Sequence, residues 1–142
     1  MASSTIPSGN QLFANQHTNR DAFVTFNVPT MAIARTCQAV INRVGNNVTM
    51  TLNNFPNTAK NGTAQVLDIP GVIPPEFRPA RDLTVFTVIR YAGPYTPVIV
   101  YIHDDGAVSI TRDYAGRDIE AGVNVGWDRM VMTWSTNTGD FA

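Results

Sequence analysis

The side chains best suited to metal or acid–base chemistry form one short cluster. His17 and His103 are the only histidines, and His103 is followed directly by Asp104 and Asp105. An imidazole nitrogen and carboxylate oxygens can together bind a divalent metal. Neighbouring residues of a strand point to opposite faces, however, so these side chains do not converge on one ion unaided. We expect a polar hairpin turn and no metal site. A metal on a symmetry axis, with one His103 from each subunit, is the alternative.

A second pair of acidic residues, Asp118 and Glu120, has a spacing that would place both carboxylates on one face of a short strand. Paired carboxyl groups are the catalytic machinery of glycosidases, but exposed carboxylates at this spacing are usually only solvated. The chain has no Gly-x-Ser-x-Gly motif, no phosphate-binding glycine loop, and no zinc or calcium spacing. The sequence therefore predicts a protein that is not an enzyme, has no catalytic residues and needs no cofactor.

Two loops carry side chains suited to binding. One turn, containing Gly93 and Pro94, is flanked by tyrosines, and a second loop covers residues 112–118. Tyr and Arg offer planar surfaces and fixed hydrogen-bond donors, which are common where proteins bind proteins or sugars. The alternative is that these side chains cap strand ends or contact a neighbouring subunit. The predicted ligand-binding residues are Tyr91, Tyr95, Arg112, Asp113, Tyr114 and Arg117.

These loops must be positioned by strands, and the clearest strand signal lies at residues 95–112. Residues 98–102 are an unbroken run of β-branched and aromatic side chains, and residues 107–111 return after an Asp-Gly pair. Asp-Gly between such runs predicts a two-residue hairpin turn, because both residues tolerate positive φ. The first strand has no polar face, so we expect protein to cover both of its sides. The cover would come from the centre of a sandwich or from another subunit.

The rest of the chain shows the same short, punctuated pattern. Residues 53–57 and 60–62 are predicted to form a polar loop, and the proline-rich residues 70–82 an extended loop across one end of the fold. No stretch keeps a 3.6-residue apolar period. The sequence therefore predicts an all-β, antiparallel, jelly-roll-like β-sandwich of eight or nine short strands with little or no helix. Further strands are expected at residues 22–28, 36–44, 48–52, 64–69, 83–91 and 129–134, with a short one near Ile119.

Composition limits the domain organisation and the partners. The 142 residues suffice for one domain, which we place at residues 21–142, with residues 1–20 as a flexible lead or stalk connection. Charged residues make up 15% of the chain, below the usual value of about 25%. The net charge is −1 and no basic run occurs, which disfavours nucleic-acid binding. Nine of the ten basic residues are arginine, a residue suited to fixed contacts at interfaces, and Lys60 is the only lysine.

Cysteine usage and apolar run lengths add further expectations. Cys37 is the only cysteine, so no disulfide can form within the chain, and we expect a buried, inert thiol. The first residues lack a basic start and an apolar core, so no signal peptide is predicted. No apolar run is long enough to span a membrane, and no membrane insertion is expected.

Several segments, taken in order, resemble the C-terminal head domains of viral and bacteriophage fibre or spike proteins. The similarity runs over about residues 36–134. It rests on a glycine-containing hairpin, a Pro-Glu-x-x-Arg-Pro loop, an Asp-Gly hairpin and a short last strand, in that order. The segments read NRVGNNVTMTL, LDIPGVIPPEFRPARDLTVF, VIVYIHDDGAVSI and GWDRMVMTWST.

The resemblance implies a homotrimeric virion head that attaches to a glycan or protein receptor on a host cell. It also implies a location on the virion surface, synthesis in the host cytoplasm, and connection to the virion or a fibre stalk through the N-terminus. Burial of one sheet in the trimer would account for a strand that is apolar on both faces. Two alternatives remain open: a structural capsid decoration or spike protein without its own receptor, and a carbohydrate-binding, lectin-like domain.

Overall fold

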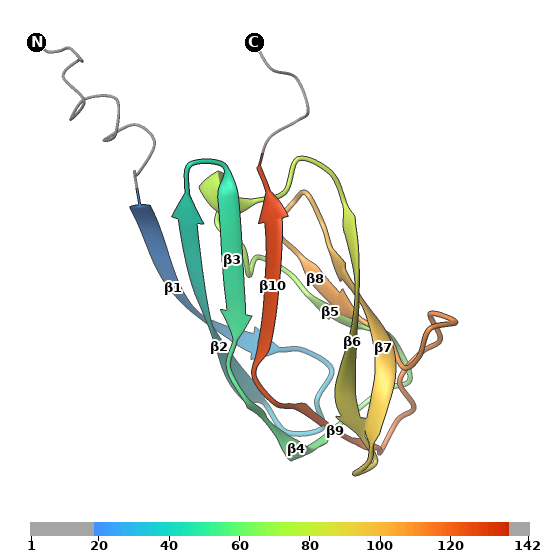
Figure 1. Ribbon diagram of the computed structural model, residues 1–142. Helices are drawn as coiled ribbons and strands as arrows, with labels where there is room; N and C mark the ends of the chain where they lie inside the picture. Colours follow the sequence, from blue (N-terminus) through green and yellow to red (C-terminus); the bar gives the residue numbers. More distant parts are fainter. Residues whose placement is uncertain (1–18, 137–142) are drawn as a thin grey trace, which may run out of the picture.

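The protein is a sandwich of two antiparallel β-sheets (Figure 1), seen in a computed structural model that describes residues 19–136. One sheet has the strand order β1-β2-β3-β10 and the other the order β4-β9-β6-β7-β8-β5. The all-β, antiparallel sandwich is thereby confirmed. The strands are β1 (Asn19–Val28), β2 (Arg35–Val44), β3 (Asn47–Leu52), β4 (Phe55–Lys60), β5 (Leu67–Ile69), β6 (Leu83–Tyr91), β7 (Tyr95–Ile102), β8 (Val108–Ile110), β9 (Asn124–Trp127) and β10 (Met130–Ser135).

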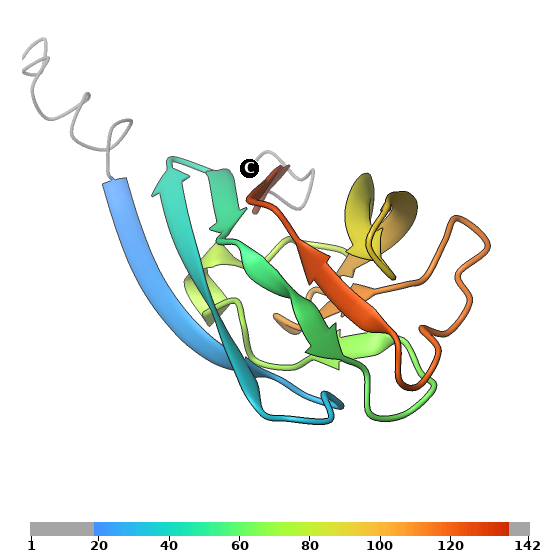
Figure 2. The same ribbon diagram turned by 90° about the horizontal axis from the view of Figure 1, so that it is seen from below.

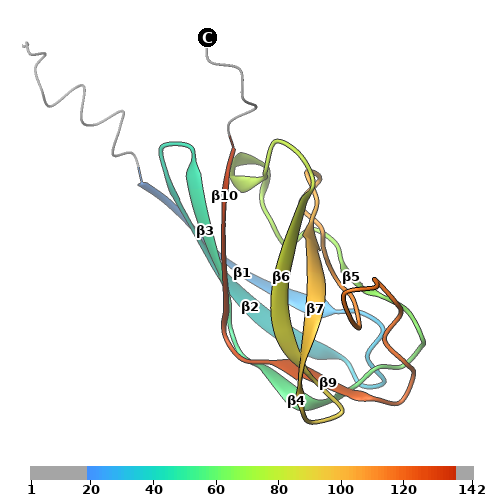
Figure 3. The same ribbon diagram turned by 45° about the vertical axis from the view of Figure 1, so that its right-hand side comes forward.

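The described residues thus form ten strands, where eight or nine were predicted. The chain crosses from one sheet to the other between β3 and β4, and crosses back between β9 and β10. β4 pairs with β9 in one sheet and β10 pairs with β3 in the other, so the two crossings lie side by side. Figure 2 shows blue β1 on one side of the molecule and the yellow β6–β7 pair on the other. Figure 3 shows β10 and β6 in separate layers.

Alternating side chains explain the four-stranded sheet. Val48, Met50 and Leu52 are fully buried, as their alternation with threonines predicts. Their neighbours on β2 follow the same period, with Ala39 and Ile41 buried on the core side. Apolar faces of both sheets close over one core, which fixes the register of each strand.

The prediction of a polar loop over residues 53–57 and 60–62 was wrong for most of its length, because β4 occupies this region. Phe55 and Ala59 are buried, but the pairing with β9 shifts register between them. β4 is an edge strand, where Pro56 removes no bond from the sheet interior. β4 also lies against Gly126, whose added Cβ would come 2.5 Å from the Asn57 Cα atom. Burial alternates along β4, but the inward position between Phe55 and Ala59 is the polar Asn57 and the strand contains Pro56, so the sequence lacks the apolar alternation that would have identified it.

Two other predicted strands are shorter than expected. The strand predicted at residues 64–69 is reduced to β5, with Gln65 forming only an isolated bridge to Ile119. The strand predicted near Ile119 is this same bridge. Ile119 is nevertheless fully buried, so its side chain belongs to the core even though its backbone leaves the sheet at once.

The proline-rich segment at residues 70–82 forms the extended loop that was predicted, with one turn of 3-10 helix, η1 (Pro75–Phe77). Ile73 and Phe77 are buried beneath it. The Trp134 indole Nε1 donates to the Phe77 carbonyl at 2.7 Å, which attaches the loop to β10. The loop therefore covers the end of the sandwich at which β1 begins and β10 ends (Figure 1).

The β7–β8 hairpin is present, but its connection is longer than the predicted two-residue turn. Ile102 pairs with Val108, which leaves five residues in the connection. Gly106 adopts φ +91°, as expected of the Asp-Gly pair, and its amide donates to the His103 carbonyl at 3.0 Å. The added length lets the turn contact the proline-rich loop, where the Ile73 amide donates to the Gly106 carbonyl.

β7 is covered on both sides by its own chain. Val98, Val100 and Ile102 face the core and are fully buried. On the outer face Ile99 is only 8% exposed, and Thr111, just after β8, bonds to the Ile99 backbone through both its amide and its side-chain hydroxyl. The apolar character of β7 therefore needs no second subunit to explain it, and the trimer must be argued from other surfaces.

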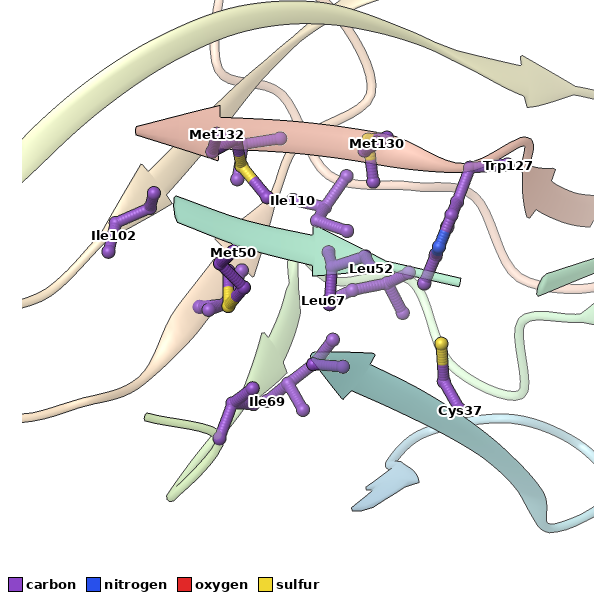
Figure 4. Packing of buried hydrophobic residues seen from close by; sticks show 14 of the residues in the cluster. Cys37, Met50, Leu52, Leu67, Ile69, Ile102, Ile110, Trp127, Met130 and Met132 are labelled. Atoms are coloured by element: carbon purple, nitrogen blue, oxygen red, sulfur yellow. The ribbon is translucent and has the colours of Figure 1, made fainter. Parts of the chain in front are cut away.

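The core is filled by branched aliphatic residues and by sulfur-containing and aromatic residues from both sheets (Figure 4). Trp127 stacks on Phe55 with ring centroids 4.5 Å apart, and its Nε1 donates to the Asn53 carbonyl at 3.2 Å. Cys37 is buried in the same core and is a free thiol, and burial raises its pKa to about 11. A thiol with that pKa is almost entirely protonated at neutral pH, as expected of an inert structural cysteine.

Candidate binding surface

The six predicted site residues lie along β6 and β7 and in the β8–β9 loop, but they form separate groups. The turn between β6 and β7 lies at the end of the sandwich opposite the start of β1 (Figure 1). The loop at residues 112–118 lies beside β7 in Figures 1 and 3. Each predicted side chain has a partner within the chain, so the surface consists of small, mutually supported clusters.

The first cluster joins Tyr95 to two residues that sequence reasoning missed. The Arg90 guanidinium lies over the Tyr95 ring, 4.1 Å from its centroid, and donates to the Tyr95 hydroxyl at 2.5 Å. That hydroxyl donates to the Asp128 carboxylate at 2.5 Å, and this bond raises the pKa of Tyr95. Tyr95 is 54% exposed, so its ring is held rigidly yet remains available to a ligand.

The second cluster brings together two of the predicted residues, Tyr91 and Arg112. The Tyr91 hydroxyl donates to Glu120 at 2.9 Å and accepts a bond from the Glu120 amide. The Arg112 guanidinium lies 3.9 Å from the Glu120 carboxylate and 5.7 Å from the Tyr91 ring centroid. Burial raises the pKa of Tyr91. Glu120 therefore acts as the anchor of this cluster, and not as half of a carboxylate pair with Asp118.

The third cluster shapes the β8–β9 loop around Asp113. The Arg117 Nε and Nη2 atoms each lie 2.7 Å from the Asp113 Oδ2 atom. The Asp113 Oδ1 atom accepts from the Ala115 amide at 2.9 Å. The Arg117 hydrogen bond is the main reason that the pKa of Asp113 is lowered. The predicted pair is thus brought together, with its carboxylate largely occupied in holding the loop and the outer edge of its guanidinium free.

Tyr114 belongs to an exposed aromatic and apolar row on the outer face of β6. Its ring meets Phe86 edge-on, with centroids 5.1 Å apart. Phe86 is 62% exposed, Tyr114 54% and Val88 46%. Phe86 and Val88 were missed, although their positions in the alternating strand 83–91 place them on its solvent-facing side. Large apolar side chains there are the signal that could have found this row.

A fourth arrangement was not predicted, because its members come from four separate segments. The His103 Nδ1 atom lies 3.3 Å from the Asp82 carboxylate and the Nε2 atom lies 2.9 Å from the Ser109 hydroxyl. The Ser109 hydroxyl donates to Asp68 at 3.2 Å. The order Asp82–His103–Ser109 resembles that of an acyl-transfer triad. A triad serine, however, donates its proton to histidine, whereas Ser109 donates to Asp68 and is itself buried. This chain of hydrogen bonds therefore links β5, β8 and the turn of the hairpin. We call these four bonded residues the clamp.

The clamp predicts a pH dependence of stability. The backbone amide of Asp104 and the His103 ring hold the pKa of Asp82 below its ordinary value of 3.8. A carboxyl group with a lowered folded-state pKa stabilises the fold above its unfolded-state pKa, and that contribution is lost as the pH falls through the folded-state value. Asp82→Asn should therefore lower the melting temperature at about pH 7, and the difference from the parent protein should shrink as the pH falls below the ordinary carboxyl pKa of 3.8.

Thermal unfolding across this pH range checks the expectation. Asp118→Asn is the matched control, because the Asp118 side chain has no hydrogen bond or ion pair within residues 19–136. It should leave the melting temperature nearly unchanged throughout. An Asp82→Asn protein that kept the parent's melting temperature at neutral pH would show that the clamp contributes nothing.

Within the described residues, no group of three or more His, Cys, Asp or Glu side chains could hold a metal ion. Both ring nitrogens of His103 already have partners, and Asp104 and Asp105 do not join them. No helix among residues 19–136 is long and apolar enough to cross a membrane. No protein-family description and no curated protein matches this sequence. Function must therefore be argued from surfaces.

One further surface is the outer face of the four-stranded sheet, which has almost no charged side chains. On the outer face of the four-stranded sheet a cross-strand row runs through Phe23, Val40, Thr51 and Val131. Phe23 is 65% exposed and Val131 61%. The other outward positions of these four strands are Asn, Thr, Gln, Ser and Val, with Asp21 as the only charged residue. We call this surface the uncharged face.

Proposed function

We propose that this chain is the head domain of a viral or bacteriophage fibre or spike, which attaches as a homotrimer to a receptor on the host cell. The receptor would be a glycan or a protein. The chain would join the virion or a stalk through its N-terminus and would act by binding, without catalysis. This proposal follows the order of motifs in the sequence and is supported by two surfaces of the sandwich.

The observation that carries the proposal is the uncharged face. Protein–protein interfaces are depleted of charged residues at their centre. A sheet face of this size that is exposed to solvent ordinarily carries several charged residues. Exposed Phe23 and Val131 at opposite ends of one row supply the apolar area that association needs. Three copies that turn this face toward a common axis would bury it, and each copy would gain stability from the others.

The receptor-binding part of the proposal draws on the opposite end of the fold. The β6–β7 turn, with the Arg90–Tyr95–Asp128 cluster, lies away from the end at which β1 begins (Figure 1). An attachment through the N-terminus would present this turn outward. Rigid aromatic and arginine side chains lose little conformational entropy on binding, and three such sites on one particle gain by avidity.

The test is a pair of substitutions with separate readouts. Phe23→Asp should reduce the mass in solution, measured by light scattering, from about three chains per particle to one, because it buries an unpaired charge in the proposed contact. Phe86→Asp, the matched control on the other sheet, should leave the mass at three chains. It should weaken attachment to cells or to a glycan array, as should Tyr95→Ala in the β6–β7 turn cluster and Arg117→Ala.

A parent protein that is a single chain at micromolar concentration would overturn the trimer. A trimer that attaches to cells equally well with and without Phe86→Asp, Tyr95→Ala and Arg117→Ala would overturn the assignment of the receptor surface. The two results are independent, since Phe23 lies on one sheet and the receptor-surface substitutions lie on the other sheet or in the loop after β8.

One observation favours the structural alternative, a capsid decoration or spike protein without its own receptor. The predicted binding side chains are bonded to one another or to neighbours, as in the Asp113–Arg117 pair, and such bonds also serve simply to hold loops. A trimer that attaches to no cell type and to no glycan would favour this function. A lectin-like domain is distinguished by glycan binding in a protein that stays monomeric.

A further inference from the structure

A pocket of about 220 Å³ lies where the β1–β2 loop meets β4. It is far from the clusters of the β8–β9 loop in sequence, and none of its residues was singled out as a binding residue. Two of its lining residues are cationic, one carries a hydroxyl group and two are apolar. They are Arg35, Lys60, Thr58, Ala32 and Ile33.

Backbone hydrogen bonds hold the two walls of this pocket, the β1–β2 loop and the end of β4, against each other. The Ala32 amide donates to the Lys60 carbonyl at 2.8 Å, and Met31 and Asn61 form an isolated bridge beside it. The Gly62 amide donates to the Thr30 carbonyl, and a Cβ at Gly62 would come 2.7 Å from that oxygen. The β1–β2 loop is thus held against the end of β4, which keeps the pocket preformed.

Among the described residues, the cations of the pocket lack the carboxylate partners that four of the other arginines have. Arg90, Arg112 and Arg117 each lie within ion-pair distance of a carboxylate. Within residues 19–136 neither Arg35 nor Lys60 has such a partner, and the Nε atom of Arg35 is buried without any hydrogen bond. A buried donor of a charged group that is left unpaired costs free energy, and no carboxylate of the described residues competes with a ligand for either cation.

The position of Arg35 explains how a cation comes to face a pocket. Arg35 is the first residue of β2, and Cys37 and Ala39, at the same period, face the core. The guanidinium therefore starts from the core side of the sheet, at the end of the sandwich where β2 begins. Thr58 and Lys60 approach from β4, two residues apart on one face of that strand.

We propose that this pocket binds the anionic group of an acidic sugar, a carboxylate or a sulfate, with Arg35 and Lys60 as its cationic ligands. Guanidinium and ammonium groups form their strongest hydrogen bonds with such oxyanions. Thr58 can donate to the same group or to a ring hydroxyl, and exposed Ile33 and Ala32 offer an apolar wall for the face of a sugar ring. The volume is below the roughly 300 Å³ at which pockets for drug-sized ligands begin, so it suits one terminal residue of a glycan.

The choice of a sugar rests on the proposed attachment function, whereas the choice of an anion rests on the pocket alone. The β1–β2 loop and β4 lie at the end of the sandwich opposite the start of β1 (Figure 1). A head joined to its virion through the N-terminus would present this end to the cell surface. The pocket would then be the receptor-binding element with the most defined chemistry.

Because Lys60 is the only lysine, a single label can report on the pocket. Reductive methylation with ¹³C-formaldehyde keeps the charge of lysine and gives one side-chain NMR signal, apart from that of the terminal amine. We expect this signal to shift saturably with glucuronic acid, galactose 6-sulfate or both, and to stay unmoved by glucose. Inorganic phosphate is a further arm, and a response to phosphate alone would overturn the assignment to a sugar.

Substitutions distinguish binding in the pocket from nonspecific attraction of anions to positive charge. Arg35→Gln should weaken binding of the responding sugar about tenfold, as should Lys60→Gln measured by calorimetry, whereas Lys60→Arg should bind nearly as well as the parent. Lys60 is exposed, so its variants should fold even where Arg35→Gln does not. Arg129→Gln, a change of charge at an exposed position on another segment, is the control and should leave binding unchanged.

The outcomes distinguish this inference from the proposed function. A silent Lys60 signal with every anion would overturn the pocket, even if the trimer and its attachment to cells were established. Equal shifts with glucose and glucuronic acid would overturn it as well. Anion binding by a protein that remains monomeric and attaches to no cell would instead support the pocket and overturn the attachment function.

Discussion

Replacing Trp127 with alanine is expected to lower the free energy of unfolding by about 4 kcal/mol, the largest effect we foresee for a single core position. The indole is 1% exposed, stacks on Phe55 and bonds to the Asn53 carbonyl. Asn53 lies where the chain leaves β3 for β4, and Trp127 ends β9 just before the return to β10. The indole therefore joins both crossings between the sheets, and its loss leaves a cavity at the point where they meet.

Urea unfolding at a fixed chain concentration measures this effect. Trp127→Phe is the matched control, because it retains an aromatic ring against Phe55 and loses the bond to Asn53. It should cost about 1–2 kcal/mol. An alanine variant that unfolds within about 1 kcal/mol of the parent would show that the two crossings hold together without the indole. The alanine variant should also loosen β4 and so weaken the Arg35–Lys60 pocket.

Gly106→Ala should cost about 3 kcal/mol, because two penalties act at one position. Gly106 has φ +91°, a conformation that a residue with a Cβ adopts at a cost of about 1–2 kcal/mol. The added Cβ would also lie 2.5 Å from the Ile73 carbonyl oxygen and 2.6 Å from the Arg78 Nε atom. The second contact can relax by side-chain movement. The contact with the Ile73 carbonyl oxygen involves backbone, so it could be relieved only by moving the hairpin away from the proline-rich loop.

Gly122→Ala separates the two penalties. Gly122 has φ +77°, and no heavy atom lies within 4 Å of the position that a Cβ would take there, so only the backbone penalty applies. The cost should be about 1 kcal/mol. Equal destabilisation by the two alanine substitutions, in the same denaturant experiment, would contradict the close packing of the hairpin turn.

Regular alternation made much of the fold predictable. β6 begins and ends at the predicted residues, and β3 differs from its prediction by one residue. Met50 and Leu52 are buried as foreseen, because a strand with one polar and one apolar face has only one way to lie on a core. The prolines at residues 70–82 likewise predicted an extended loop, since proline cannot donate a bond to a sheet or helix.

The failures arose where tertiary contacts replaced local pattern. β4 contains Pro56 and a register shift, and the position between its two buried residues, Phe55 and Ala59, is the polar Asn57, so no apolar alternation marks the strand. The hairpin turn at Gly106 is lengthened by its contact with the proline-rich loop, which no local sequence could reveal. The outer face of β7 is covered by a loop that follows it in sequence, and the prediction had assigned that cover to another subunit as one alternative.

The candidate binding surface was only partly predictable for the same reason. Tyr and Arg composition identified the loops, and the Asp113–Arg117 pair is local enough to be foreseen from its four-residue spacing. Glu120 meets Tyr91 from 29 positions away, and Asp128 meets Tyr95 from 33. Such partners depend on how the strands are ordered in the sheet. The Arg35–Lys60 pocket depends on the β1–β2 loop reaching β4, and no spacing in the sequence encodes it.

The position of β1 at the margin of its sheet has a consequence for handling the separated chain. Residues 22–28 of β1 read AFVTFNV, with no charge and no proline, and among residues 19–136 no strand pairs with one side of their backbone. Natural proteins usually block such a margin with lysine or proline, because it can recruit a strand from another molecule and seed fibrils. A single copy of the chain would therefore be prone to aggregate by pairing through this edge.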